Sequence, residues 1–160
     1  MAILTQTGRT AIAQSVKNQQ IHLAWGTGDE AWDSNTIPED QMQTDLIREV
    51  GRRVVDEVLF CVGDENGELI TPTGRFTASE NPTNNLYIKT KYDFTDAAEY
   101  TIRELGLFVG TVTNGELPAG QKYFLPTDLI DPGILLLLEH SVPLIRTAAT
   151  RESFSFVVTF

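Results

Sequence analysis

Short segments rich in β-branched, aromatic and aliphatic residues dominate the sequence after residue 50. Residues 58–62, 86–94, 100–110 and 153–160 are the clearest of them, and Gly, Pro, Asn and Asp residues separate them. This pattern is typical of strands divided by turns. An earlier segment, residues 8–19, instead has apolar side chains at helical spacing. The sequence therefore predicts an α+β fold, with an N-terminal helix followed by a predominantly antiparallel or mixed β-sheet core.

The first part of the chain is expected to hold three elements. Thr7 can cap the helix of residues 8–19, because a Thr side chain accepts a hydrogen bond from the unpaired N–H groups of a first helical turn. Residues 21–25 alternate apolar and polar side chains, which predicts a half-buried strand. Residues 41–50 are expected to form a short helix or a turn.

Two Asn-Gly pairs predict tight turns, because such a pair supplies the positive φ angles that a two-residue hairpin requires. Asn66-Gly67 is therefore expected to return the chain into a strand that starts at Leu69. Asn114-Gly115 is expected to form a second hairpin-type turn.

The C-terminal segment, residues 153–160, alternates so that Phe154, Phe156, Val158 and Phe160 fall on one face of a strand. In a separate domain such a face belongs to the core, because terminal strands are commonly held by sheet pairing. A terminal strand can also add to the sheet of a neighbouring protein. The core is the favoured alternative, and the second one stays open.

The chain length of 160 residues suits a single domain, residues 1–160, or one domain with a small C-terminal subdomain over residues 111–160. No apolar run approaches the ~18 residues of a membrane span, so membrane insertion is not expected. The net charge of −10 and the scattered basic residues argue against nucleic acid as a partner. The N-terminus lacks a basic region followed by an apolar core, so we expect synthesis and folding in the cytoplasm.

The residues that most often carry chemistry do not form a known motif in this sequence. Cys61 lies in an apolar run and is expected to be a buried core residue. His22 and His140 are far apart and lie in no zinc-binding motif. The sequence has no Gly-x-Ser-x-Gly nucleophile motif. We therefore expect no catalytic residue, no cofactor and no metal, and the protein is not expected to be an enzyme.

The segment of residues 26–33 combines two glycines with three acids. A dinucleotide site needs a third glycine in a fixed position, which Ala31 occupies here. Asp29, Glu30 and Asp33 would repel phosphate, and they do not follow the spacing of an EF-hand. A turn at the end of a strand is the favoured interpretation, and a weak surface calcium site is the minor alternative.

Aromatic residues provide most of the expected interface positions. Trp32 lies in a polar loop, where exposing a Trp side chain without a purpose is costly. It is either an interface anchor, since Trp is enriched in binding hot spots, or a packed side chain. The full set of interface candidates is Trp32, Asp33, Tyr87, Tyr92 and Phe160.

The strand of residues 100–110 contains the charged residues Arg103 and Glu104 between apolar neighbours. A charge in such a strand lies at a sheet edge or is buried with a partner of opposite charge. We expect Arg103 to pair with a carboxylate such as that of Glu49, which would fix the sheet to the preceding segment.

Four motifs, in this order, resemble the N-terminal domain of phage tail-collar fibre proteins. Residues 4–13 resemble its Leu-Thr-x-x-Gly turn before a helix, and residues 22–29 resemble its strand before a Gly-Asp turn. Residues 44–52 are similar to its Leu-x-x-Glu-x-x-Arg segment. Residues 100–108 are similar to its Thr-Ile-Arg-Glu-hydrophobic-Gly-Leu-Phe signature.

The resemblance implies a structural component of a contractile phage tail, baseplate or collar, which anchors a fibre or joins neighbouring subunits by protein–protein contacts. It implies other tail or baseplate proteins as partners, and a homo-oligomer or multiple copies in the particle. The implied location is the virion tail, after synthesis in the cytoplasm of the host bacterium. The expected contact elements are the loops of residues 28–40, 71–85 and 116–133.

A second function is kept as an alternative. A small carbohydrate-binding module for a bacterial surface glycan would need exposed aromatic rings as stacking faces. Trp32, Tyr87 or Tyr92 would supply them.

Overall fold

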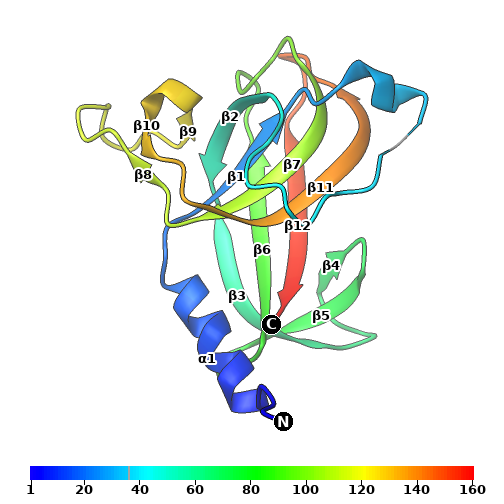
Figure 1. Cartoon of the computed structure of the whole chain (residues 1–160), viewed down its shortest axis with the longest axis vertical. Helices are drawn as coiled ribbons and strands as arrows, with labels where there is room; N and C mark the ends of the chain where they lie inside the picture. The colour runs from blue at the N-terminus through cyan, green and yellow to red at the C-terminus, as the bar shows by residue number, and fades with distance from the viewer. Residues whose placement is uncertain (36) are drawn as a thin grey trace. The chain divides into compact units, whose positions relative to one another are not determined.

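The computed structural model of the chain describes residues 1–35 and 37–160 (Figure 1). These residues form two compact units. Unit 1 contains Met1–Gln19, Val55–Lys91 and Ser153–Phe160, and unit 2 contains Gln20–Val54 and Tyr92–Glu152. Each unit is therefore built from segments that are far apart in the sequence.

Unit 1 consists of one helix and a five-stranded sheet with the strand order β12-β6-β3-β5-β4. Two of these strands begin or end one residue inside unit 2. The elements are α1 (Gln6–Lys17), β3 (Glu57–Gly63), β4 (Leu69–Thr71), β5 (Gly74–Ser79), β6 (Asn85–Tyr92) and β12 (Glu152–Thr159).

Helix α1 begins two residues earlier than predicted, and its cap is Thr5 rather than Thr7. Thr5 has an extended backbone, and its hydroxyl accepts a hydrogen bond from the Gly8 N–H at 3.1 Å. Ala13 and Val16 are the buried side chains of the helix. At its end, Lys17 donates from Nζ to the Val58 carbonyl at 2.8 Å, which ties α1 to β3.

The sheet of unit 1 is antiparallel around β3, which pairs with β5 on one side and β6 on the other. Cys61 on β3 is completely buried, which confirms the prediction for this residue, and burial raises the pKa of its thiol. The strand β12 pairs with β6 of the same chain, so the C-terminal strand is part of this sheet. The Phe160 N–H donates to the Asn84 carbonyl at 2.9 Å and fixes the end of the chain.

The hairpin predicted at Asn66-Gly67 is wrong. A turn does form, because the Gly67 N–H donates to the Asp64 carbonyl at 2.9 Å, but Gly67 does not have a positive φ. The strand that follows pairs with β5 and not with β3. A Cβ at Gly67 would overlap the backbone of Phe76, so this glycine is needed for a close approach and not for its φ angle.

Unit 2 contains a second five-stranded sheet with the order β11-β7-β1-β2-β9, and a two-stranded ribbon of β10 and β8. Its strands are β1 (Ile21–Gly26), β2 (Glu49–Val54), β7 (Thr101–Val109), β8 (Val112–Thr113), β9 (Tyr123–Phe124), β10 (Leu129–Asp131) and β11 (Ile134–Ile145). Two short 3-10 helices complete it, η1 (Glu30–Asp33) and η2 (Pro126–Asp128).

Strand β1 is the centre of this sheet and pairs with β2 and β7. All six of its residues are buried, so the predicted half-buried strand is wrong in its burial. On one face Ala24 packs with Phe108 and Leu46, and partly buried leucines of β11 cover this cluster. On the other face Trp25 stacks on the ring of Tyr92. The alternation in the sequence therefore did not mark a solvent-exposed face.

Two further predictions for unit 2 are settled by the structure. Residues 41–50 form turns before β2 begins at Glu49, so the turn was the correct alternative and the helix was not. The hairpin predicted at Asn114-Gly115 is wrong, because β8 pairs with the distant strand β10. The general α+β architecture, with one N-terminal helix before antiparallel sheets, is confirmed. No helix of the described residues is long and apolar enough to cross a membrane.

Candidate functional site

The centre of unit 2 is a group of three aromatic side chains. Trp25 stacks on Tyr92 with ring centroids 3.5 Å apart, and its indole N–H donates to the Tyr123 hydroxyl at 3.1 Å. The Tyr92 hydroxyl donates to the Leu23 carbonyl at 2.5 Å. Burial raises the pKa of Tyr123 to about 12 and that of Tyr92 well above its ordinary value. Both phenols are therefore protonated at neutral pH and serve as hydrogen-bond donors.

Arg52 on β2 is a completely buried cation that holds the loop before β11. Two of its nitrogens bind the carboxylate of Glu49, each at 2.7 Å. Its Nη1 donates to the Pro132 carbonyl at 2.6 Å and to the Thr111 hydroxyl at 3.2 Å. The guanidinium also lies over the ring of Phe108, 4.0 Å from the centroid. Every face of this cation is therefore occupied by the protein itself.

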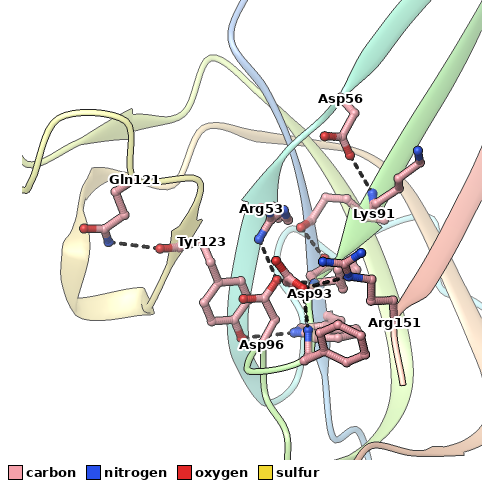
Figure 2. A network of polar contacts seen from close by, with 12 residues as sticks. Arg53, Asp56, Lys91, Asp93, Asp96, Gln121, Tyr123 and Arg151 are labelled. Atoms are coloured by element: carbon pink, nitrogen blue, oxygen red, sulfur yellow. Dashed lines mark hydrogen bonds and ion pairs between the residues drawn. The ribbon is translucent and has the colours of Figure 1, made fainter. Parts of the chain in front are cut away.

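Arg53, the next residue on β2, holds a different loop. Its Nη1 lies 2.6 Å from the carboxylate of Asp96, which is buried and also accepts the Asp93 N–H at 2.7 Å. Figure 2 shows this arrangement. Arg151 binds the other acid of the same turn, with 2.9 Å between its Nε and Asp93. The Phe94 N–H and then Arg151 hold the pKa of Asp93 below its ordinary value.

Arg146, which follows β11, binds the turn of residues 93–97 through the backbone carbonyls of that turn. Its Nη2 donates to the carbonyls of Asp93 and Asp96 at 2.8 and 3.3 Å. Its Nη1 lies 3.3 Å from the Glu152 carboxylate. Ala97 in this turn has a φ of 47°, a conformation that a residue other than glycine adopts only when its surroundings impose it. Arg53 binds the carboxylate of Asp96, the residue before Ala97, and Arg146 binds its carbonyl.

Arg103 has a carboxylate partner, as expected, but the predicted partner was wrong. Its Nε and Nη2 bind Asp33 on η1 at 2.6 and 2.9 Å, and its Nη1 donates to the Thr27 carbonyl at 3.1 Å. Glu49 is not available to it, because the local pair of Glu49 with Arg52 occupies both carboxylate oxygens. The hydrogen bonds from Arg103 hold the pKa of Asp33 below its ordinary value.

Glu104, the neighbour of Arg103, is a site residue that the sequence analysis did not assign a role. It is completely buried, and its carboxylate oxygens accept the backbone N–H groups of Ile47 and Arg48 at 3.1 and 2.9 Å. The signal for it was present, since a charged side chain between apolar strand residues requires partners. The partners themselves are backbone groups, which no side-chain pattern reveals.

Three of the five predicted interface residues are buried. Trp32 is 8% exposed and stacks on His140, with 4.3 Å between ring centroids. Tyr87 is 4% exposed and Tyr92 is fully buried, and Phe160 is half-buried. Trp32 is thus packed inside unit 2. The exposed stacking faces that a carbohydrate-binding module would need are not formed by Trp32, Tyr87 or Tyr92.

The charged side chains described above, those of Arg52, Arg53, Arg103, Glu104 and Arg146, are occupied with other side chains and with the backbone of unit 2. No group of three or more His, Cys, Asp or Glu side chains within residues 1–35 and 37–160 could hold a metal ion. His22 lies on β1, stacked on Phe124, and burial followed by the charge of Arg52 lowers its pKa to about 4. The arrangement fixes loops to a sheet and is that of a structural protein.

Comparison with known proteins gives the same class. The whole chain, residues 1–160, matches the family described as "Baseplate wedge 3 tail fiber network component". The chain belongs to this family. It is a structural protein of the phage baseplate, a component of the virion tail, and not an enzyme. No curated protein matches the sequence.

The predicted function and location are therefore confirmed, and the predicted partners are confirmed at a coarser level. A tail fibre network component contacts other baseplate and fibre proteins. The family matched differs in name from the tail-collar fibre family that the four motifs resemble, although both belong to phage tails.

Proposed function

We propose that this baseplate component is an adaptor that joins tail fibre proteins to neighbouring baseplate subunits, and that several copies act in each particle. The observation that carries the proposal is the way that charged side chains fix the loops of unit 2. Arg52, Arg146, Arg103 and Glu104 are buried, and each holds a loop to a strand of the sheet or to a residue next to it.

Fixed loops suit a protein whose role is to bind others. A loop that already has its bound conformation loses little conformational freedom on association, so more of its contact energy contributes to affinity. The segments expected to make these contacts are residues 28–40 and 116–133 of unit 2, and residues 71–85 of unit 1. Short strands lie within the last two segments, so their contact residues are expected in the turns between these strands. Loops carried on a rigid sheet are where binding residues usually lie.

The resemblance of residues 4–110 to the tail-collar fibre N-terminal domain supports the same role, since that family anchors fibres or joins subunits. Repeated copies follow from the rotational symmetry of tail assemblies, in which one adaptor serves each repeated position.

Baseplates from a phage lacking this gene, complemented with a tagged wild-type chain, would test the proposal. Quantitative mass spectrometry should find the chain in a fixed ratio to other wedge proteins, and fibre proteins should be lost when the chain is absent. Baseplates that keep their full set of fibre proteins without the chain would overturn the adaptor role.

A further inference from the structure

A groove of about 290 Å³ lies at the edge strand of the unit 2 sheet. Leu135–Leu138 of β11 form one wall. The other wall comes from the end of the 28–40 loop and the turn that follows it, and contains Glu39, Asp40, Gln41 and Gln43. The groove therefore has an apolar side made by a strand and a polar, acidic side.

Strand β11 is the last strand of its sheet and pairs only with β7 among the described residues. Its outer edge is protected from His140 onward in two ways. At His140, the backbone N–H donates to the Glu39 carboxylate at 2.9 Å, and the ring nitrogen Nδ1 lies 2.7 Å from the Ile37 carbonyl. Beyond it, the register shifts between His140 and Leu144, and Pro143 lies in this irregular stretch.

Bulges and proline are common means of blocking an edge strand against pairing. The stretch of Leu135–Leu138 contains no proline, and its one register shift lies between Leu135 and Leu137. From Leu137 to His140 the pairing with β7 is regular, and the groove lies beside this part of the edge. An edge strand with free space beside it is the usual receptor for an extended segment of another chain, which adds to the sheet as one more strand.

The charges around the groove indicate the sign of the charge that its occupant carries. Glu39 and Asp40 line the groove, and its lining contains no Lys or Arg. Glu139 on β11 follows the groove directly and makes no ion pair with another residue that the structure describes. Burial and then the negative charge of Glu39 raise the pKa of Glu139. A cation placed between Glu39 and Glu139 would relieve this repulsion.

We propose that the groove beside Leu135–Leu138 receives an extended, basic segment of a neighbouring baseplate or fibre protein, which pairs with the edge of β11. This inference rests on the adaptor role and names the kind of partner. Apolar side chains of the segment contact the leucines, and its Lys or Arg side chains contact Glu39, Asp40 and Glu139. A second copy of this chain is disfavoured as the occupant, because each chain carries a net charge of −10.

The test uses the full-length chain and a ten-residue peptide of alternating Lys and Val as the probe. Binding is measured by fluorescence anisotropy, and the site is mapped by amide chemical shifts. The expected shifts fall on Leu135–His140 and Glu39–Gln43. The double variant Glu39→Gln/Glu139→Gln should weaken binding about tenfold or more, because two contacts between opposite charges are lost.

The matched control removes two acids elsewhere, as Glu65→Gln/Glu80→Gln in exposed positions of unit 1. It should bind like the wild type. Since Glu39 also holds His140, Gln41→Lys serves as a second variant that adds a repelling charge to the wall and leaves this bond in place. It too should weaken binding.

An equal loss of affinity in both double variants, shifts outside the groove, no effect of Gln41→Lys, or no binding by the wild type would each overturn the inference. The baseplate experiment distinguishes failure of the groove inference from failure of the adaptor role. If the wild-type chain is required for fibre attachment but Gln41→Lys baseplates keep all their fibres, the groove is not the contact and the adaptor role stands.

Discussion

Arg103 and Glu104 are neighbours on β7, but they bind different loops. Arg103 makes two hydrogen bonds to Asp33 on η1, whereas Glu104 accepts the backbone N–H groups of Ile47 and Arg48. Consecutive strand residues point to opposite faces, so two adjacent charges can serve two separate segments. This gives the Thr-Ile-Arg-Glu motif a structural role in the baseplate protein.

The variant Glu104→Gln should lower the free energy of unfolding by about 1–3 kcal/mol. A Gln side chain has one carbonyl oxygen, so the N–H of Ile47 or Arg48 would lose its acceptor in a buried site. Chemical denaturation of both proteins would measure the difference. Glu99→Gln, at an exposed position two residues before β7, is the control and should unfold like the wild type. Equal stabilities of all three proteins would contradict the role of Glu104.

The ion pair of Arg103 and Asp33 should stabilise the conformation of the 27–33 segment. In Asp33→Asn the amide accepts only one of the two bonds from Arg103, so hydrogen exchange in this segment should become faster. Glu30→Gln, in the same 3-10 helix but without a side-chain hydrogen bond, should exchange at the wild-type rate. Faster exchange in both variants, or in neither, would argue against the pair.

The same pair has a dependence on pH. Arg103 lowers the pKa of Asp33 in the folded protein below its unfolded value. The stabilisation is therefore fully present above the unfolded pKa and is lost as the pH falls through the lowered, folded-state value. Protection of the 27–33 segment should decrease only in acid, below the ordinary range for an Asp side chain.

The sequence predicted the strands of this protein better than it predicted their pairing. Hydrophobic pattern located β6, β7 and β12 within a few residues, because burial on at least one face determines which residues a strand can contain. Pairing depends on contacts between distant segments. The Asn66-Gly67 turn therefore suggested a local hairpin, although β3 pairs with β5 and the glycine makes room for Phe76.

The candidate site shows the same limit. The pattern indicated that Arg103 needs a carboxylate, because a buried cation must be paired. It did not indicate which carboxylate pairs with Arg103, because Glu49 is excluded only by its contact with Arg52, which binds both of its carboxylate oxygens. For Trp32 the sequence left two alternatives, an interface position and a packed position. The structure shows it packed on His140, more than one hundred positions away in the sequence, and a local pattern does not reveal such a contact.

Gly51 on β2 should be intolerant of even a methyl group. A Cβ there would overlap the ring and hydroxyl of Tyr123, which accepts the hydrogen bond from Trp25. Gly51→Ala should therefore lower the free energy of unfolding by about 1–3 kcal/mol, the usual cost of overpacking. The emission of the buried Trp25 should shift as Tyr123 moves. Gly63→Ala is the matched control in a strand, because a Cβ at Gly63 meets no atom within 4 Å. If Gly51→Ala is as stable as Gly63→Ala, the packing around Tyr123 is looser than the structure indicates.

His22 should make the protein less stable in mild acid. Its pKa is about 4 in the folded protein and 6.5 as the ordinary value, because burial and then Arg52 oppose the charged form. Between these values the unfolded chain binds a proton that the folded chain does not, so stability falls as the pH falls from 6.5 to 4. The loss amounts to at most about 3 kcal/mol. His22→Phe keeps a ring for stacking on Phe124 and removes the titrating group. The difference in unfolding free energy between the wild type and His22→Phe should therefore be constant above pH 7 and change steadily below 6.5. A difference that stays constant down to pH 4 would show that His22 becomes protonated inside the folded protein.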